Sequence, residues 1–197
     1  MNLPNKLTLS RIVLSPVFMV FLLADGLPFL YIAFFLFLTA ALTDIFDGYL
    51  ARKTGVQTSF GKLMDPFADK LLISLALVGL LARGAPGLPG WMVVVIIGRE
   101  LVVTGFRSLA AYRGLVIAAS RMAQLKTVFQ MVLVGWILGQ LTFLGRIGWV
   151  SHAGIVQDYA VSDIVLFLLL WSTVVLTLVS GLDYLVRNRA VLGSALR

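Results

Sequence analysis

The stretch that decides the fold runs from residue 44 to residue 69 and reads DIFDGYLARKTGVQTSFGKLMDPFAD. It holds four of the nine acidic residues of the chain, namely Asp44, Asp47, Asp65 and Asp69. The apolar segments on either side, 28–42 and 71–82, contain no charged residue. Carboxylates at the ends of apolar spans are costly to place in or near lipid. We therefore interpret this stretch, called the Asp motif below, as a functional site carried by two successive membrane helices.

Helical spacing predicts that these carboxylates gather. Asp44 and Asp47 are three residues apart and share one face of a helix, and Asp65 and Asp69, four apart, share a face of the next. Unpaired carboxylates facing one another would repel, and a divalent cation removes that conflict. The chain has no cysteine, and oxygen ligands favour a hard cation. The Asp motif therefore predicts a site for Mg²⁺ or Mn²⁺.

Small residues and an arginine accompany the acids. Gly48 and Ala51 fall on the helix face of Asp44 and Asp47, where their small size leaves room for a ligand against the backbone. Arg52 can offer a planar fork of N–H donors to a phosphate. The alternative interpretation is structural: acids at helix ends that form salt bridges or reach toward the membrane surface.

The Asp motif resembles the signature of the CDP-alcohol phosphotransferase family, Asp-x-x-Asp-Gly-x-x-Ala-Arg, a short gap, then Gly-x-x-x-Asp-x-x-x-Asp. All eight named positions are present, at Asp44, Asp47, Gly48, Ala51, Arg52, Gly61, Asp65 and Asp69. The resemblance implies one or two divalent ions held by Asp44, Asp47 and Asp65. It implies a general base at Asp69. It also implies a CDP site lined by Gly48, Ala51, Arg52 and Gly61.

The composition places the chain in a membrane. Of its 197 residues, 60% are hydrophobic and 13% charged, and the mean hydropathy is +1.00. We expect an all-α polytopic membrane protein, a single domain over residues 1–197, with a short interfacial helix at the amino terminus. Hydropathy predicts six transmembrane helices after it, at about residues 10–24, 28–52, 64–84, 89–111, 121–144 and 162–187.

Basic residues predict the orientation. They are frequent at both termini and in the even-numbered connections, whereas the opposite connections carry only Arg83 and Arg146. By the positive-inside rule, both termini and the Asp motif are cytoplasmic, in the inner (plasma) membrane of the cell. The net charge of +7 suits membrane lipids and anionic substrates, and no basic, aromatic-interleaved module predicts nucleic-acid binding.

A second polar cluster lies farther along the chain. Arg99 and Glu100 are adjacent opposite charges within the fourth span, which neighbouring helices can satisfy. With later residues they resemble the phosphatidylglycerophosphate synthase branch of the family, matched at Arg99, Glu100, Arg107, Ser120, Lys126, Thr127 and Gln130. That resemblance implies an acceptor phosphate held by Arg107, Arg121 and Lys126. Taken singly, each basic residue is equally typical of a cytoplasmic loop.

This resemblance is limited in two ways. The branch has Gly-Lys where this chain has Ala123 and Gln124, which removes one positive charge where the acceptor would bind. The likeness covers roughly the first 130 residues, and we interpret the last span, 162–187, as generic lipid-facing sequence.

The resemblance implies a homodimeric enzyme of phospholipid biosynthesis. It would transfer a phosphatidyl group from CDP-diacylglycerol to glycerol 3-phosphate, releasing CMP and giving phosphatidylglycerophosphate. The Asp motif alone does not exclude related transferases whose acceptor is serine, inositol phosphate or phosphatidylglycerol; the acceptor-side residues favour glycerol 3-phosphate. A cation transporter also places acids in spans, but it usually has repeated halves and broken helices. Here the acids occur once, at helix ends.

Overall fold

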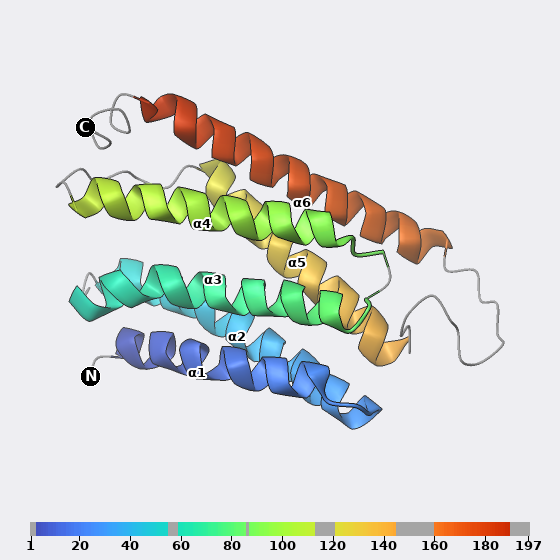
Figure 1. The fold of residues 1–197 in the computed structure, drawn as a ribbon. Helices are drawn as coiled ribbons and strands as arrows, with labels where there is room; N and C mark the ends of the chain where they lie inside the picture. Colours follow the sequence, from blue (N-terminus) through green and yellow to red (C-terminus); the bar gives the residue numbers. More distant parts are fainter. Residues whose placement is uncertain (1–2, 55–58, 86, 113–120, 145–159, 190–197) are drawn as a thin grey trace. The chain divides into compact units, whose positions relative to one another are not determined.

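The computed structural model describes residues 3–54, 59–85, 87–112, 121–144 and 160–189. In these residues the chain is all-helical (Figure 1), which confirms the predicted fold class. The described helices are α1 Leu3–Leu23, α2 Leu27–Thr54, α3 Ser59–Ala82, α4 Gly90–Tyr112, α5 Arg121–Phe143 and α6 Ala160–Arg187. They coincide with the six apolar segments found by hydropathy, and the main differences are at the beginnings of α1 and α3.

The amino terminus differs in detail from the prediction. We expected a short interfacial helix ahead of a separate first span, but α1 is continuous from Leu3 to Leu23. Pro4 lies in the first turn, where a missing N–H costs nothing because that N–H has no partner within the helix. No break follows before the apolar segment, so the residues ahead of position 10 form the first turns of α1.

The chain divides into two compact units. The first contains residues 1–88 and 134–158, and the second contains residues 89–133 and 159–197. Helices α1, α2 and α3 belong to the first unit, and α4 and α6 belong to the second. Helix α5 passes from the second unit into the first at Val134.

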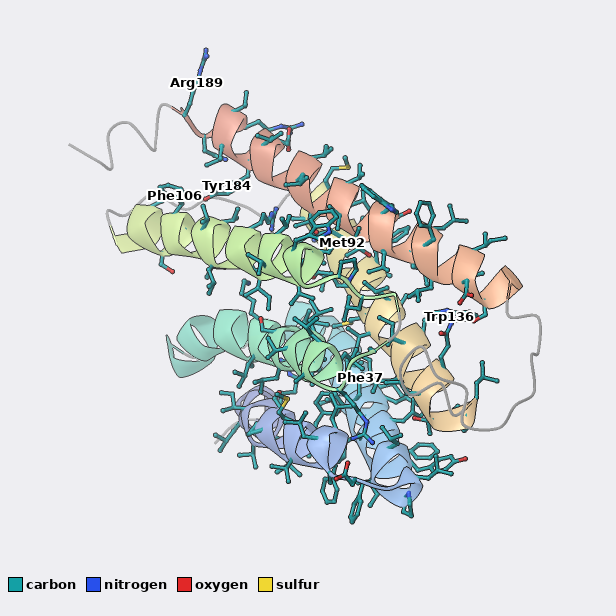
Figure 2. All side chains as sticks on the ribbon, turned by 45° about the vertical axis from the view of Figure 1, so that its right-hand side comes forward. Phe37, Met92, Phe106, Trp136, Tyr184 and Arg189 are labelled. Carbon is teal, nitrogen blue, oxygen red and sulfur yellow. The ribbon has the colours of Figure 1, made fainter. Side chains whose placement is uncertain are left out.

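In the first unit, α1 packs against both α2 and α3 (Figure 1). Helices α1 and α3 lie close together at Gly79 of α3, where an added Cβ would lie 2.6 Å from Cδ2 of Leu22 and 2.7 Å from Sδ of Met19. Phe37 of α2, labelled in Figure 2, contacts Phe18 of α1 with ring centroids 5.9 Å apart. These contacts hold the helices that carry the Asp motif.

The guanidinium of Arg83 links the carboxyl ends of α1 and α3. Nη1 of Arg83, just after α3, donates hydrogen bonds to the main-chain oxygens of Leu22 and Ala24 at 2.6 and 2.9 Å. Those oxygens belong to the last turn of α1 and to the residue after it. Helices α1 and α3 therefore run in the same direction and end side by side.

In the second unit, α4 packs against α6, and Trp91 lies edge to face with Trp171 at a centroid distance of 6.0 Å. Helix α6 has two contrasting faces. Its buried face carries Leu166, Leu170, Thr173, Val174, Thr177, Ser180, Gly181 and Tyr184. Its exposed face carries Ile164, Phe167, Leu168, Trp171, Val175, Leu178, Val179, Leu182 and Val186.

This distribution is the reverse of that of a helix on the surface of a soluble protein, which turns polar residues outward. Lipid is the solvent that favours an apolar outer face and a buried polar one. The interpretation of the last span as generic lipid-facing sequence therefore fits its outer face only, because the other face is buried and partly polar.

Two helical segments in the described part of the chain are long and apolar enough to cross a membrane. They are Met122–Phe143, with a mean hydropathy of 1.3, and Ser162–Arg187, with 2.4. Shorter apolar segments lie at Leu9–Leu23, Leu27–Thr43 and Lys70–Ala82. Length and composition thus support membrane insertion most strongly for α5 and α6.

Candidate active site

The backbone places the Asp motif on two consecutive helices of the first unit. Positions 44–52 lie in the last turns of α2, and positions 61, 65 and 69 lie in the first turns of α3. Because α2 leads directly into α3, both halves of the motif lie at the same end of this unit. The predicted arrangement of two helices joined by a short connection is therefore confirmed.

The side chains of the motif lie outside the described residues, since those of residues 44–67 and of Asp69 are not described. The roles given to Asp44, Asp47, Asp65 and Asp69 consequently stay predictions. So do those of Gly48, Ala51, Arg52 and Gly61.

The structure describes the side chains of α2 up to Thr43, immediately before the Asp motif. Thr39 and Thr43 donate hydroxyl hydrogen bonds to the carbonyls of Phe35 and Thr39, each at 2.7 Å, so these polar groups are satisfied within their own helix. On α3, Ala68 is fully buried immediately before Asp69. The hydroxyls that precede the motif on α2 are thus bonded within their own helix, and one position of the motif on α3 is buried.

The donor set fits a hard cation. Among the residues whose side chains are described, no group of three or more His, Cys, Asp or Glu is placed to hold a metal ion; the acids of the Asp motif are not among those residues. The motif offers only carboxylate oxygens, and the chain has no cysteine. This chemistry fits Mg²⁺ or Mn²⁺ and does not fit a soft metal.

The second polar cluster is a buried set of charges in the second unit. Glu100 of α4 is 8% exposed and Lys126 of α5 is 3% exposed, and Oε1 of Glu100 forms an ion pair with Nζ of Lys126. Nη1 of Arg99 lies 3.4 Å from the same oxygen. The expectation that neighbouring helices satisfy the Arg99–Glu100 pair is confirmed.

Helix α6 also takes part in this cluster. Nη2 of Arg99 donates to Oγ of Ser180 at 3.0 Å, and that hydroxyl donates to the carbonyl of Thr177 at 3.1 Å. The next residue is Gly181, where an added Cβ would lie 3.1 Å from Cγ and 3.2 Å from Nε of Arg99. The Arg99 side chain therefore lies directly against the backbone of α6.

Sequence reasoning missed Ser180, Gly181 and Tyr184. Tyr184, labelled in Figure 2, is buried on the α6 side that packs on α4. A usable signal was present in the spacing of polar residues along the last span at Thr173, Thr177, Ser180 and Tyr184. Steps of three and four residues mark a single helix face.

The remaining predicted acceptor residues differ in their surroundings. Arg107 is exposed on α4, two turns beyond Arg99. Arg121 is the first residue of α5, and its side chain lies outside the described residues. Of the predicted acceptor residues with described side chains, Lys126 is thus the buried one.

The cluster has a chemical bias toward anions. Arg99 and Lys126 carry two positive charges and Glu100 one negative charge, so these three side chains sum to one positive charge. Within the described residues, Nε of Arg99 and Nε2 of Gln130 are buried donors without a hydrogen-bond partner. Two cations beside one carboxylate, with a buried N–H donor on Arg99, suit an anionic ligand such as a phosphate.

Comparisons with known proteins agree with the motifs. The chain matches the family described as CDP-alcohol phosphatidyltransferase over residues 1–179. It is 40% identical over 200 residues to a Bacillus subtilis (strain 168) protein named CDP-diacylglycerol–glycerol-3-phosphate 3-phosphatidyltransferase, with 95% of each chain covered. An Escherichia coli (strain K12) protein of the same name is 35% identical over 197 residues, with 96% of each chain covered.

A third relative, a probable phosphatidylglycerophosphate synthase of Mycobacterium tuberculosis, is 40% identical over 189 residues, which cover 94% of this chain and 81% of the relative. These matches show that the chain belongs to the CDP-alcohol phosphatidyltransferase family, a family of membrane-associated transferases. The family match reaches residue 179 and so includes most of α6, well beyond the roughly 130 residues recognised by motif.

Proposed function

We propose that this protein transfers the phosphatidyl group of CDP-diacylglycerol to glycerol 3-phosphate, giving phosphatidylglycerophosphate and CMP. The observation that carries the proposal is the relative named for this reaction that aligns with 95% of this chain at 40% identity. An alignment of that extent includes both the Asp motif and the second polar cluster. The net positive charge of that cluster supports an anionic acceptor.

The donor side is assigned to the Asp motif. Asp44, Asp47 and Asp65 would hold one or two Mg²⁺ or Mn²⁺ ions, which when bound would neutralise the pyrophosphate of CDP-diacylglycerol. Gly48, Ala51, Arg52 and Gly61 would line the site of the CDP group. Small residues allow the ligand to approach the backbone, and Arg52 adds a fork of donors for a phosphate.

The chemistry needs no covalent intermediate with the protein. The hydroxyl oxygen of the acceptor attacks the β-phosphorus of the donor, and the bond from that phosphorus to the oxygen of CMP breaks. Asp69 would take the proton of the hydroxyl, and CMP would leave with the bridging oxygen. Catalysis then consists of positioning and charge neutralisation, as in other phosphoryl transfers.

The acceptor side is assigned to the second unit. Lys126, with Arg107 and Arg121, would bind the phosphate of glycerol 3-phosphate. Ala123 and Gln124 provide one positive charge fewer than the pattern of the synthase branch. An assay with several acceptors therefore tests this side of the site directly.

The proposed setting is the plasma membrane. All six helices would cross it, with both termini and the Asp motif on the cytoplasmic side, and the protein would act as a homodimer. The distribution of basic residues and the apolar outer face of α6 support this arrangement.

The deciding experiment offers one donor and several acceptors. Protein purified in micelles is incubated with CDP-diacylglycerol, Mg²⁺ and, in separate reactions, glycerol 3-phosphate, serine, inositol phosphate and phosphatidylglycerol. Mass spectrometry of the lipids should find phosphatidylglycerophosphate, with CMP released in equal amount. An Asp44→Asn preparation is the control for enzyme carried over from the host. Phosphatidylserine, phosphatidylinositol phosphate or cardiolipin as the product would assign a different acceptor.

A further inference from the structure

The ion pair between Glu100 and Lys126 includes a third charged residue, Arg99, and this arrangement suggests a role beyond neutralising charge. Both Nζ of Lys126 and Nη1 of Arg99 approach the same oxygen, Oε1 of Glu100. The two cations come from different helices, α5 and α4, and the carboxylate between them is 8% exposed. The carboxylate of Glu100 is therefore a buried partner that the two positive charges share.

We propose that Glu100 is a positioning residue that holds the Lys126 ammonium for the phosphate of the acceptor. The proposal rests on the function proposed above. Lysine carries its charge on a flexible four-carbon stem, so its ammonium has no fixed place unless a partner provides one. An ammonium has three N–H donors, and one group can therefore contact a carboxylate and a phosphate oxygen together.

The position of Arg99 decides how this carboxylate is shared. Ser180 accepts a hydrogen bond from Nη2 of Arg99 at 3.0 Å, which directs one end of the guanidinium toward α6. Gly181 leaves the space that the stem of Arg99 occupies, 3.1 Å from where a Cβ would stand. With Arg99 held in this way, its Nη1 stays 3.4 Å from Oε1 of Glu100, which leaves that oxygen to Lys126.

The role of α6 follows from these contacts. A side chain at residue 181 would crowd Cγ and Nε of Arg99, so the guanidinium would have to shift. Nη1 of Arg99 already makes a long contact of 3.4 Å to Oε1, and a shift that shortened it would make Arg99 a stronger competitor of Lys126 for that oxygen. The Ser180–Gly181 step of α6 therefore acts on the acceptor through Arg99, Glu100 and Lys126 in turn.

A double-mutant cycle tests whether Glu100 positions Lys126. The apparent KM for glycerol 3-phosphate and for CDP-diacylglycerol is measured for the unaltered protein, Glu100→Gln, Lys126→Ala and the double variant. Glu100→Gln should raise the KM for glycerol 3-phosphate about tenfold, within the range of coupling between contacting charged residues. In the Lys126→Ala background the same change should have little further effect. Additive effects of the two changes would overturn the proposal.

A conservative variant shows whether the effect on KM comes from lost positioning or from lost folding. Glu100→Asp keeps the charge but is one methylene shorter, so its KM for glycerol 3-phosphate should fall between those of the unaltered protein and Glu100→Gln. The KM for CDP-diacylglycerol should change little in both. If Glu100→Asp matches Glu100→Gln in both KM values, Glu100 has a structural role only, and the positioning role is wrong.

Paired glycine variants test the part played by α6. Gly181→Ala brings a methyl group against Arg99, whereas at Gly98, on α4 next to Arg99, an added Cβ meets nothing within 4 Å. Gly181→Ala should raise the KM for glycerol 3-phosphate several-fold, and Gly98→Ala should leave it unchanged. An equal KM for glycerol 3-phosphate in the two variants would mean that α6 has no part in positioning Lys126.

The outcomes separate this inference from the proposed function. If the unaltered protein uses another alcohol, the proposed function fails, and the same cycle is run with that alcohol. Coupling between Glu100 and Lys126 in the KM for that acceptor would then mean that the positioning role survives for a different substrate. Absence of coupling while glycerol 3-phosphate is the substrate defeats the inference and leaves the function intact.

Discussion

Single residues differ in how far sequence alone explains them. Lys126 was singled out by its motif, and the structure adds that its ammonium is buried against Glu100. A contact between residues on different helices cannot be read from spacing along one helix, because it depends on how the helices pack. By contrast, the acids of the Asp motif were found from sequence, since charge within apolar segments is rare enough to identify a site.

The first prediction is that removing divalent ions abolishes transfer. Without cations between them, the carboxylates of the Asp motif would repel the pyrophosphate of the donor. Chelation with EDTA should stop CMP release, and added Mg²⁺ or Mn²⁺ should restore it. Turnover at the full rate in excess chelator would contradict the assignment of Asp44, Asp47 and Asp65 as ligands.

A second prediction separates two acids of the same motif. Asp69→Asn is nearly isosteric but cannot accept the proton, so single-turnover transfer should fall by about 10²–10⁴-fold, the usual contribution of a general base. Metal-dependent binding of a CDP-lipid should persist. Asp47→Asn removes a ligand charge and should weaken metal binding together with the rate. Equal loss of metal binding in both variants would make Asp69 a ligand as well.

The third prediction concerns Lys126. Lys126→Ala should raise the apparent KM for glycerol 3-phosphate by about tenfold, the equivalent of one lost hydrogen bond to a charged group. The KM for CDP-diacylglycerol should change much less, because Lys126 belongs to the second unit and not to the Asp motif. Steady-state rates with each substrate varied in turn give both constants. A matching rise in both would assign Lys126 to the scaffold.

Helices were the most predictable level of this fold. Long apolar segments bounded by turn residues and charges identified all of the described helices, because backbone hydrogen bonds in lipid must be satisfied within the segment. Hydropathy did not reveal which face of α6 is turned inward, since an average over a segment ignores direction. Thr173, Thr177 and Ser180 carried that information in their spacing.

A fourth prediction tests the contact of α1 with Gly79 of α3. Gly79→Ala should lower the unfolding temperature, since overpacking costs about 1–3 kcal/mol and alanine returns only about 1 kcal/mol of helix propensity. Gly139→Ala on α5 is the control, because its Cβ would lie 3.9 Å from Phe34 in ordinary contact. Thermal unfolding in detergent compares them. A Gly79→Ala protein at least as stable as Gly139→Ala would mean that the ends of the Leu22 and Met19 side chains readily shift to make room.

At the scale of the whole molecule, the sequence predicts the orientation of the protein in the membrane from the distribution of its basic residues. The fifth prediction uses the absence of cysteine, which makes single introduced cysteines the only thiols. Asp25 follows α1 and Arg189 follows α6, and both are exposed. In intact cells a membrane-impermeant maleimide should label Asp25→Cys and spare Arg189→Cys until the cells are opened. Labelling with the reverse pattern would invert the proposed topology.

The bond from Arg83 to the end of α1 has an electrostatic consequence. Helices α1 and α3 are parallel neighbours, so the partial negative charges at their carboxyl ends add at one place instead of cancelling. Arg83 lies at that place and bonds to main-chain oxygens of Leu22 and Ala24. Peptide dipoles thus serve this cation as its counter-charge.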